Sequence, residues 1–533
     1  MSRKILILLI LPMLVLGLSL TAGAEPLPEF ELMTTTEGYD PIRYEAAFLI
    51  EENFAELGIH VDVQPTEFST LIDNFYNEQD FEITIAGWSG RVERLDPQHF
   101  LGTLQSGQTD PGGNNPGGYV NERVDELFAQ QEVEFDVYRR REMVHEIQEI
   151  SVSEQPVNVL FYRDEVLAFN RNKFEGFQPM AGEGIYTEWL PFDVTPLTDD
   201  RVVTIGTSQE PDNINPLDST TVWGWKFMRL YYDKLIRLTP DVEPEPWAAE
   251  SFEAVDEDTI EVVLREGMYF HDGEPVTVED VKFSYDYFMD QDFAYFRPFY
   301  QPLDYVEIVD DSTLRFHLEV PVSNFITVTM SQIPILPEHL WADIEVAQDL
   351  APDEIPTVGS GPMKFETFDS GEYKSLSTFE DHFAADDIDI DGIDYIIYAD
   401  AEGVFTGLIT EEADMNAWRL EPGHIEPAEA EDHLEVVSVP DHGYYHMTYN
   451  LRIEPFDDVN FRRAIAHAIP KDTFVDVLLD GLGEPGTSVI SPANPFWHNP
   501  DVERFEYDLD RAREILEEAG YYIEDGVLHF PEN

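Results

Sequence analysis

The sequence predicts an α/β fold made of more than one lobe, and three observations lead to this prediction. Segments with helical apolar spacing alternate with short strand-like apolar segments along most of the chain. The chain has 533 residues, more than one hydrophobic core usually serves. Hydrophobic residues make up 43% of it and aromatic residues 13%, which is ample for packed interiors and argues against a disordered acidic protein.

The alternation is clearest in the first third of the chain. Ala47, Ile50, Phe54 and Leu57 have the spacing of one helix face, and Gly58 follows as a helix stop. The other elements expected here are strands at residues 59–63, 81–86 and 157–162 and helices at residues 123–128 and 138–150. Residues 88–118 form a long loop rich in Gly, Pro, Asn and Asp, and such segments in compact domains are often functional.

The rest of the chain continues the pattern after a change of composition. Residues 191–200 form a prolyl, acidic stretch of the kind that joins structural units. Beyond it we expect strands at 201–205, 259–264 and 313–318, helices at 278–289 and 509–519, and a Gly-Ser-Gly-Pro turn leading into a strand within 358–365.

The first residues predict export. Arg3 and Lys4 precede an apolar run at residues 5–20, which ends at the small-residue triplet 22–24, as in a secretory signal peptide. The run is shorter than the roughly 20 residues that a membrane-spanning helix needs. Cysteine is absent, which excludes disulfides, thiolate nucleophiles and the lipid-modified cysteine that tethers many exported receptors. We therefore expect a freely diffusing periplasmic or secreted protein.

The charge of the chain is extreme. Asp and Glu number 108 against 31 Lys and Arg, for a formal net charge of -77 that is spread along the sequence. Such a charge excludes nucleic acid as a partner. Self-repulsion is strong in dilute buffer but is screened at molar salt, where the Debye length falls to about 3 Å. We interpret the composition as an adaptation to brine.

One run within residues 250–284 carries a family resemblance. It contains Thr-Ile-Glu-Val-Val-Leu-Arg-Glu-Gly-Met-Tyr-Phe-His-Asp-Gly-Glu-Pro-Val-Thr-Val-Glu-Asp-Val-Lys-Phe-Ser, and it resembles the signature of the family 5 extracellular solute-binding proteins. Supporting matches lie at residues 215–217, 335–340, 358–362, 455–459 and 462–465. The family includes oligopeptide, dipeptide, glutathione and nickel receptors of ABC importers. The resemblance implies a type II periplasmic-binding-protein fold, with two hinged α/β lobes, an extra smaller lobe and no cofactor.

The order of the segments differs from that of the family. There, the equivalent of residues 201–533 comes first and that of residues 26–190 comes last. We expect a circular permutation that still folds, because domain termini often lie close together; a fragment of two tandem receptor genes is the alternative. The expected organisation is a signal peptide (1–24), lobe III second part (25–172), lobe I (173–240, including the linker 191–200), lobe II (241–357), lobe I continued (358–440) and lobe III first part (441–533).

The segment around Trp88, Ser89 and Arg91 is the first candidate for ligand contact. Peptide receptors of the family often carry an aspartate three residues after this tryptophan, where it pairs with the α-ammonium of the ligand. Here that position is Arg91, whose guanidinium can hold a carboxylate through two parallel hydrogen bonds. Glu93 or Asp96 could still supply a negative charge. The alternative for Arg91 is a rim arginine paired with a surface acid.

Two further tryptophans and one acid complete the candidate site. Trp223 and Trp225 lie in an expected loop after the first strand of lobe I, and aromatic walls with a few polar groups suit small-ligand sites. Each tryptophan could equally be core. Glu210 is either near the ligand or one more solvated acid. Asn114 and Asn115, between Pro-Gly-Gly and Pro-Gly-Gly, are expected to make turns.

The sequence contains no motif that indicates catalysis, metal binding or nucleotide binding. His271 and Asp272 resemble a catalytic pair, but the resemblance assigns them a structural role. The histidines show no metal-ligand spacing, and the sequence lacks a phosphate loop, a dinucleotide fingerprint and a Gly-x-Ser-x-Gly elbow. We expect that the protein is not an enzyme and binds no metal. We expect a monomeric receptor that captures a peptide or peptide-like solute by lobe closure and delivers it to an ABC permease. A sensory receptor and a secreted hydrolase are the alternatives.

Overall fold

The computed structural model describes residues 25–91, 94–211, 213–219, 221–240, 243–292, 296–369 and 373–531. The expected signal peptide and Glu93 lie outside these ranges. Within them, no helix combines the length and the apolar character needed to cross a bilayer. The structure is mixed α/β, as the sequence predicts, and the expected strands and helices recur with ends shifted by a few residues.

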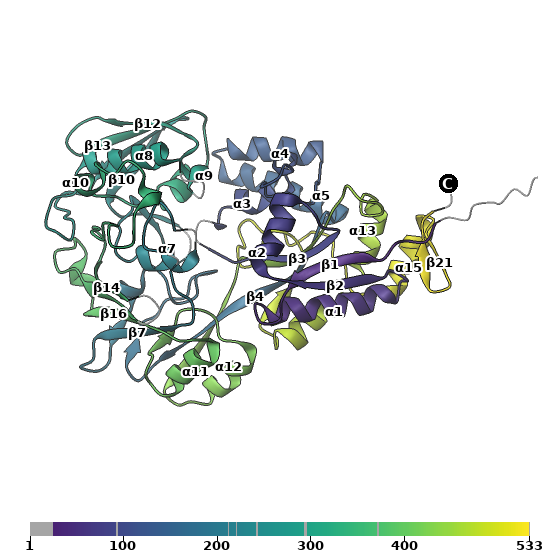
Figure 1. Cartoon of the computed structure of the whole chain (residues 1–533). Helices are drawn as coiled ribbons and strands as arrows, with labels where there is room; N and C mark the ends of the chain where they lie inside the picture. The colour runs from purple at the N-terminus through teal and green to yellow at the C-terminus, as the bar shows by residue number, and fades with distance from the viewer. Residues whose placement is uncertain are drawn as a thin grey trace, which may run out of the picture.

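A single long strand, β4 (Val157–Asn170), runs from one half of the molecule into the other (Figure 1). Its first residues pair with β19 (Tyr444–Tyr449), and its later residues pair with β18 (Leu434–Pro440). The chain therefore crosses twice between the halves, near residues 163–166 and 439–444. We keep the names lobe I, II and III for the expected segments; β4 changes partners before the expected boundary at residue 172.

The sheet of lobe III combines strands from both ends of the sequence. β1 (Phe30–Thr35) lies between β2 (Val61–Thr66) and β3 (Ile83–Trp88), parallel to both. β3 then pairs antiparallel with β19, which in turn lies beside β4. β20 (Gly483–Pro485) also pairs with β4.

Helices cover this sheet because each places an apolar face against it. α1 (Pro41–Ala55) starts at the Asp40 cap, whose side chain accepts a hydrogen bond from Arg43 N, and it buries Ala47, Ile50 and Phe54, three of the residues whose spacing predicted it. The same core contains residues of α13 (Val459–Ala466) and α15 (Leu509–Glu518). The other long helices of lobe III are α4 (Glu122–Glu132) and α5 (Val137–Glu154).

Lobe I has its own mixed sheet. β7 (Val202–Thr207) lies between β16 (Gly392–Ile397) and the short β17 (Met415–Asn416), parallel to both. β15 (Tyr373–Thr378) and β14 (Met363–Asp369) extend the sheet antiparallel beyond β16.

Lobe II is a four-stranded antiparallel sheet with one long helix. The strand order is β10 (Ala249–Asp256), β11 (Thr259–Leu264), β13 (Thr313–Leu318) and β12 (Leu303–Ile308). α8 (Val278–Gln291) begins with a capping box between Thr277 and Asp280. One hydrophobic core runs through lobes I and II.

The remaining elements are short. They are α2 (Phe68–Ile72), α9 (Arg297–Tyr300), α10 (Glu338–Trp341), α11 (Ala401–Ile409), α12 (Pro422–Glu429), α14 (Lys471–Thr473), β8 (Ile236–Leu238), β9 (Pro244–Pro246), β21 (Tyr522–Glu524) and β22 (Val527–His529).

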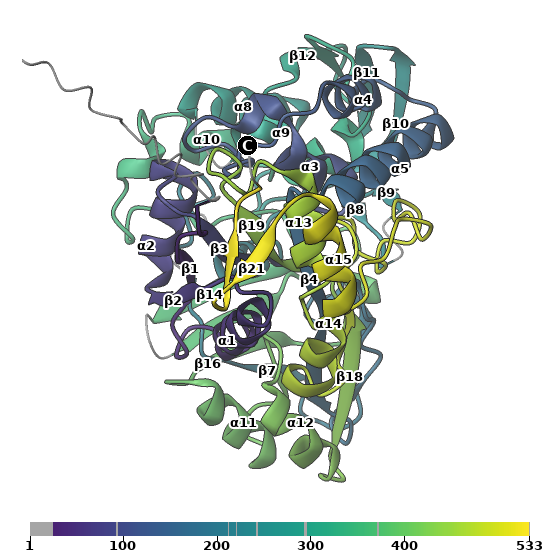
Figure 2. The same cartoon turned by 90° about the vertical axis from the view of Figure 1, so that its right-hand side faces the viewer.

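The two ends of the described chain lie side by side in lobe III. Pro26 forms an isolated antiparallel bridge with His529. Leu27 N donates to Leu528 O at 2.8 Å, and Phe530 N donates to the carbonyl of residue 25 at 3.0 Å. Figure 2 shows the β21–β22 hairpin in the same lobe as β1 and α1, elements from the opposite end of the sequence.

Three segments expected to be loops or linkers contain short regular elements. Trp223 and Trp225 belong to a helix, α7 (Val222–Met228), because Thr221 caps it through Gly224 N. The expected linker 191–200 is folded, since it contributes to α6 (Leu190–Asp193) and to β6 (Thr195–Pro196), which pairs with β5 (Phe174–Glu175). The loop 88–118 contains a helix, α3 (Pro97–Leu101), capped by Asp96.

Candidate functional site

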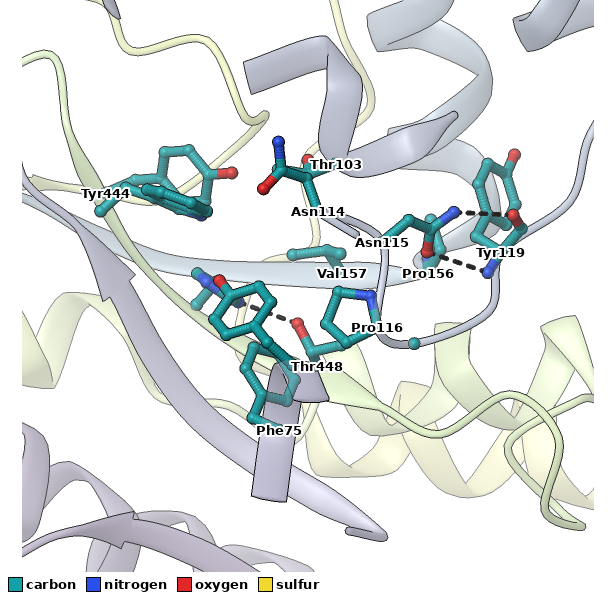
Figure 3. Close-up of a pocket in the computed structure, with 14 residues that line it drawn as sticks. Phe75, Thr103, Asn114, Asn115, Pro116, Tyr119, Pro156, Val157, Tyr444 and Thr448 are labelled. Atoms are coloured by element: carbon teal, nitrogen blue, oxygen red, sulfur yellow. Dashed lines mark hydrogen bonds between the residues drawn. The ribbon is translucent and has the colours of Figure 1, made fainter. Parts of the chain in front are cut away.

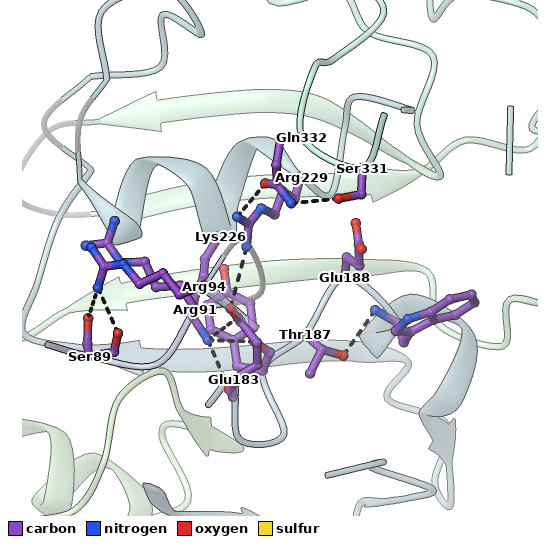
Figure 4. A network of polar contacts seen from close by, with 12 residues as sticks. Ser89, Arg91, Arg94, Glu183, Thr187, Glu188, Lys226, Arg229, Ser331 and Gln332 are labelled. Carbon is purple, nitrogen blue, oxygen red and sulfur yellow. Dashed lines mark hydrogen bonds and ion pairs between the residues drawn. The ribbon is translucent and has the colours of Figure 1, made fainter. Parts of the chain in front are cut away.

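A buried polar network lies where the lobes meet (Figure 4). Lys226 Nζ lies 3.0 Å from Glu183 Oε2, and Arg229 Nη1 lies 3.6 Å from the other carboxylate oxygen. Arg229 Nη2 donates to Gln332 Oε1 of lobe II at 3.0 Å. The three charged side chains are 8% exposed or less. Two cations thus share one carboxylate away from water, where charge pairing is stronger than at a surface.

The segment after β3 contributes the lobe III side of this network. Trp88 is the last residue of β3, and the Arg94 guanidinium lies 4.9 Å from the centre of its ring. Arg94 Nη1 donates to Ser89 O at 2.7 Å and to Ser89 Oγ at 3.2 Å. The backbone N and O of Arg91 lie 3.0 and 2.8 Å from His442 Nε2, and the tautomer of His442 decides which of these bonds forms. Ser89, Arg91 and Arg94 are drawn together with Glu183 and Lys226 in Figure 4.

Close backbone approach explains the glycines of this segment. β3 pairs with β19 so that Trp88 lies opposite Tyr444. A Cβ atom at Gly90 would collide with the Asp441 carboxylate and crowd the Gly182 backbone. Glycine therefore lets the lobe III segment lie directly against Asp441, which connects β18 to β19, and against Gly182 of lobe I.

Asp96 is placed in a structural pair instead of in this network. Its carboxylate accepts from Arg140 Nη1 at 2.8 Å and Nη2 at 2.6 Å, and it caps α3 through Gln98 N at 3.0 Å. The Arg140 and Asp96 side chains are 5% and 9% exposed. The geometry therefore argues against the expectation that Asp96 supplies charge to a ligand.

Trp225 is a core residue. Its Nε1 donates to Ser219 O at 3.0 Å, its ring centre lies 4.8 Å from that of Phe296, and the residue is 5% exposed. These contacts leave little of Trp225 for a ligand, which favours the core alternative over the binding one.

Trp223 lines a small pocket in lobe I, and Glu210 pairs with a lysine of the pocket wall. Trp223 packs edge-on against Trp418, with ring centres 4.6 Å apart. Glu210 Oε1 accepts from Lys374 Nζ at 3.1 Å. The pocket has a volume of about 20 Å³ and is lined by Tyr186, Thr207, Gln209, Pro211, Trp223, Phe227, Lys374, Tyr395, Ile397 and Ala417. Trp223 and Lys374, the partner of Glu210, thus share this pocket.

Lobes II and III also touch outside the network. Ser323 N donates to Glu132 O at 3.0 Å, and Asn324 Nδ2 donates to Gln98 Oε1 at 3.0 Å. Leu95 of lobe III packs with Met180 and Leu238. Lobe III therefore contacts both lobe I and lobe II in this structure.

Sequence reasoning did not find Glu183, Lys226, Arg229 or Trp418. Lys226 lies on α7 and Arg229 is the C-cap residue of this helix, about one turn further on. Had the helix been predicted, the spacing of these two residues would have placed them on the same face. Glu183 lies 43 residues from Lys226 in the sequence, and no local sequence pattern predicts that the two residues are in contact.

The structure agrees with the structural reading of two other candidates. His271 Nε2 lies 2.9 Å from Gly361 O, and His271 N donates to Gly359 O at 2.8 Å. Asn115 Nδ2 donates to Gln105 O and Tyr119 O, so its amide closes a turn. In the described part of the chain, no group of three or more His, Cys, Asp or Glu side chains is arranged to hold a metal ion.

Comparison with protein families places the chain in a known family. The profile described as bacterial extracellular solute-binding proteins, family 5 Middle, matches residues 243–531, more than half of the chain. Among curated proteins, the oligopeptide-binding protein AppA of Bacillus subtilis is 29% identical over 334 residues, covering 61% of this chain and 60% of AppA. The glutathione-binding protein GsiB of Salmonella typhi is 26% identical over 326 residues, covering 60% of this chain and 62% of GsiB.

Solved structures give a similar picture. The AppA structure from Bacillus subtilis in complex with a nonapeptide is matched with a TM-score of 0.50 and 25% identity, over 62% of this chain and 66% of that one. The substrate-binding protein CtaP of Listeria monocytogenes is matched with a TM-score of 0.54 and 24% identity, over 61% and 66%. The chain thus spans about 60% of the length of the curated relatives that it matches.

Proposed function

Because this chain belongs to the family 5 extracellular solute-binding proteins, we propose that it is the receptor of an ABC importer and captures a peptide or peptide-like solute between its lobes. In this role the protein carries out no chemical turnover. It binds, closes and delivers the solute to a membrane permease. Curated relatives bind oligopeptides and glutathione, which supports a peptide-like ligand.

The observation that carries the proposal is the polar network shared by the three lobes. A solute held there would contact Ser89 and Arg91 of lobe III, Lys226 of lobe I and the neighbourhood of Gln332 of lobe II at once. A ligand that contacts all the lobes stabilises their closed arrangement, which is how binding becomes a conformational signal.

Arg91 is proposed to set the charge preference of the site. A guanidinium pairs with a carboxylate and not with an ammonium, so an anionic group of the ligand fits this side of the network. Lys226 and Arg229 add two more cations, both within 3.6 Å of the Glu183 carboxylate. Trp88 would provide the apolar wall beside them, and Trp223 the corresponding surface in lobe I.

We also propose that the chain is circularly permuted relative to its relatives. The family profile covers residues 243–531 only, and the alignment with AppA covers 61% of the chain. The strands contributed by residues 30–88 nonetheless lie in the same sheet as β19, and the described ends are joined by the Pro26–His529 bridge. A receptor opened at a new place in lobe III would have this arrangement.

Export, a periplasm-like location and operation in brine complete the proposal. They rest on the N-terminal sequence and on the net charge of -77. A monomeric, untethered receptor would meet its permease by diffusion.

Native mass spectrometry of the protein purified in molar salt tests the binding role. We expect a small solute to co-purify, and calorimetry with that solute should show a weaker affinity for Arg91→Ala. Arg123→Ala is the matched control, because Arg123 pairs with Glu146 on the surface of α4 and α5. A native affinity in Arg91→Ala would remove Arg91 from the site. Cleavage of peptide mixtures would contradict the receptor role.

The permutation has its own test. A chain in which residues 25–200 follow residue 531 restores the family order. We expect it to melt cooperatively in molar salt and to bind the same solute. If the chain in its present order shows no cooperative melting while the reordered chain does, a tandem-gene fragment becomes the better account.

A further inference from the structure

Both chain crossings between the halves of the molecule carry a buried carboxyl group. Glu165 lies on β4, the long strand in Figure 1, and Asp441 lies in the connection from β18 to β19. Each residue is 4% exposed. The two crossings run side by side, since Asp441 N donates to Arg163 O at 3.3 Å. A change in the angle between lobe III and lobe I must therefore pass through these residues.

The cations at the crossings pair with other acids than Asp441. Arg419 Nη1 of lobe I lies 3.0 Å from Glu165 Oε1, and Arg163 Nη2 lies 3.7 Å from Glu421 Oε2. In the part of the chain that the structure describes, neither arginine forms an ion pair with Asp441. The Asp441 carboxylate is held by its own turn instead, where Oδ1 accepts from Gly443 N at 2.9 Å.

The surroundings of Asp441 make a negative charge on it costly. Burial raises the pKa of Asp441, and the charge of Glu183 raises it further, although backbone hydrogen bonds and the charge of Arg419 act in the opposite direction. Burial also raises the pKa of Glu165, and the charge of Asp441 adds to this effect. Because one guanidinium faces two buried carboxyl groups, a proton on one of them restores neutrality.

Lobes I and III cover Asp441 together. A Cβ atom at Gly90 of lobe III would collide with the Asp441 carboxylate and crowd the backbone of Gly182 of lobe I. When lobe III turns away from lobe I, Gly90 and Gly182 separate and water reaches the carboxyl group. Hydration favours the charged form, so the pKa of Asp441 then falls toward the ordinary aspartate value of about 3.9.

We propose that Asp441 holds a proton while lobes I and III are in contact, as in this structure, and releases it to water when they separate, so that capture of a solute takes up one proton. The proposal rests on the proposed function only for the solute. The proton and its link to the lobe angle do not depend on it.

The direction of the pH effect follows from the pKa of Asp441. Contact between the lobes raises this pKa, so a falling pH favours the contact as it passes through the raised value. The gain is complete below the ordinary pKa of an aspartate. A solute that needs the lobes in contact would therefore be held more tightly in acid.

Other charged or titratable groups surround the two carboxyl groups and their arginine. They are Asp40 of lobe III, Arg163, Glu183, Lys226, Arg419 and His442. His442 follows Asp441 directly, and its Nε2 lies 3.0 and 2.8 Å from the backbone N and O of Arg91. Because a histidine can titrate in the same pH range, its contribution has to be separated by experiment.

A second histidine, His446, lies further along β19. Its Nδ1 lies 2.9 Å from Thr448 Oγ1, a contact drawn in Figure 3. Burial, and secondarily the charge of Arg43, lower the pKa of His446 to about 3. This ring therefore stays neutral at the pH values at which Asp441 is tested.

Pulsed EPR tests the link without a solute. The chain has no cysteine, so Val133→Cys of lobe III and Val320→Cys of lobe II can carry the two spin labels. In molar KCl, the ratio of short to long distances should rise as the pH is lowered from about 8 to about 5, by at most about tenfold per pH unit for one proton. Asp441→Asn imitates the protonated group and should keep the short distance throughout. A native distance distribution that does not change with pH would overturn the proposal.

Two further variants identify the group that titrates. Asp164→Asn is the matched control, because Asp164 lies at the same crossing but accepts from Ser438 Oγ on the exposed side, and it should keep the native pH dependence. Glu165→Gln should move the transition to lower pH, since Arg419 then stabilises the ionised form of Asp441. A pH dependence that persists in Asp441→Asn and is lost in His442→Gln or Glu165→Gln would assign the proton to another residue and contradict the proposal.

Infrared difference spectroscopy detects the proton itself. A protonated carboxyl group absorbs apart from carboxylates, so the spectrum of the native protein minus that of Asp441→Asn should contain one such band, which titrates together with the EPR transition. If Asp441→Asn does not fold, Glu165→Gln replaces it, because the band and the transition should shift together. Absence of the band overturns the proposal. A protein that shows the band and the transition but binds no peptide loses the proposed function and keeps the proton switch.

Discussion

Asn324 of lobe II donates a hydrogen bond from Nδ2 to Gln98 Oε1 of lobe III at 3.0 Å. Gln98 Nε2 in turn donates to Glu132 Oε1 at 2.8 Å, and Glu132 O accepts from Ser323 N at 3.0 Å. Two neighbouring residues of one lobe thus meet two residues of the other. Because this contact is separate from the interlobe network, it can bias closure whether or not a solute is bound.

Removing this contact should shift the lobes toward an open arrangement. The chain has no cysteine, so Val133→Cys and Val320→Cys, both at exposed positions flanking the contact, can carry spin labels alone. When Asn324→Ala is added to the doubly labelled protein, pulsed EPR should show an additional population with a longer distance between the labels. Loss of about 1 kcal/mol of hydrogen bonding corresponds to about a fivefold change in the closed-to-open ratio.

Asn172→Ala is the matched control for that experiment, because Asn172 is exposed in the turn after β4, beyond the β4 residues that pair with β18. The doubly labelled protein without further change should give one short distance. If Asn324→Ala leaves the distance distribution unaltered, the contact is incidental to closure.

Salt should stabilise this protein strongly. With a formal net charge of -77, self-repulsion opposes the compact state, and raising the salt from 0.1 M to 1 M shortens the Debye length from about 10 Å to about 3 Å. We expect the melting temperature to rise steeply with KCl over this range. Sucrose at matched water activity should raise it far less, and a melting temperature that does not depend on salt would contradict the interpretation as a brine protein.

The sequence predicted the elements better than the contacts. α1 was predictable because Ala47, Ile50 and Phe54 fall on one face, and β3 because alternating apolar residues lead to Trp88. α7 was not predicted because a helix of seven residues is too short to show a hydrophobic period. The only local sign of it was Thr221, a residue type that often caps helices.

The candidate site was predictable only in part, for a physical reason. Ser89 and Arg91 could be selected as candidates because they lie within a single motif that resembles a known family, and their role in binding stays a prediction. Asp96, five residues further on, pairs with Arg140 on another helix, and nothing local distinguishes that pairing from a ligand role. Glu183 and Lys226 come together only through the tertiary fold.

Asp96 should matter for stability more than for binding. Asp96→Asn leaves the buried guanidinium of Arg140 without its charge partner, and breaking a buried pair in this way costs about 3–5 kcal/mol. Urea unfolding at constant molar KCl measures this. The double variant Asp96→Asn with Arg140→Met should recover part of the loss, because no unpaired charge remains. A stable Asp96→Asn protein with weakened solute binding would restore Asp96 to the ligand site.

Lys471 is the clearest case of a buried charge that lowers stability. Its Nζ donates to Gly486 O at 2.9 Å, and burial lowers the pKa of Lys471 from 10.5 to about 7. The unfolded chain therefore holds more protons on this residue than the folded one between about pH 7 and 10.5. The cost of burying the ammonium is full below pH 7 and is lost as the pH rises through this window.

Lys471→Met should remove that cost. The free energy of unfolding of the variant, relative to the native protein, should be most favourable near pH 7 and should fall by up to about 1.4 kcal/mol per pH unit toward pH 10. Lys282→Met, at a partly exposed lysine of α8 beside Asp286, provides the reference slope in the same urea titrations. In the variant, Gly486 O loses its hydrogen bond from Lys471, which lowers the gain in unfolding free energy by about 1–3 kcal/mol at every pH. The decisive quantity is therefore the slope of the relative stability with pH and not its absolute value. If the relative stability of Lys471→Met has the same slope as that of Lys282→Met, the lysine is not buried as the structure describes.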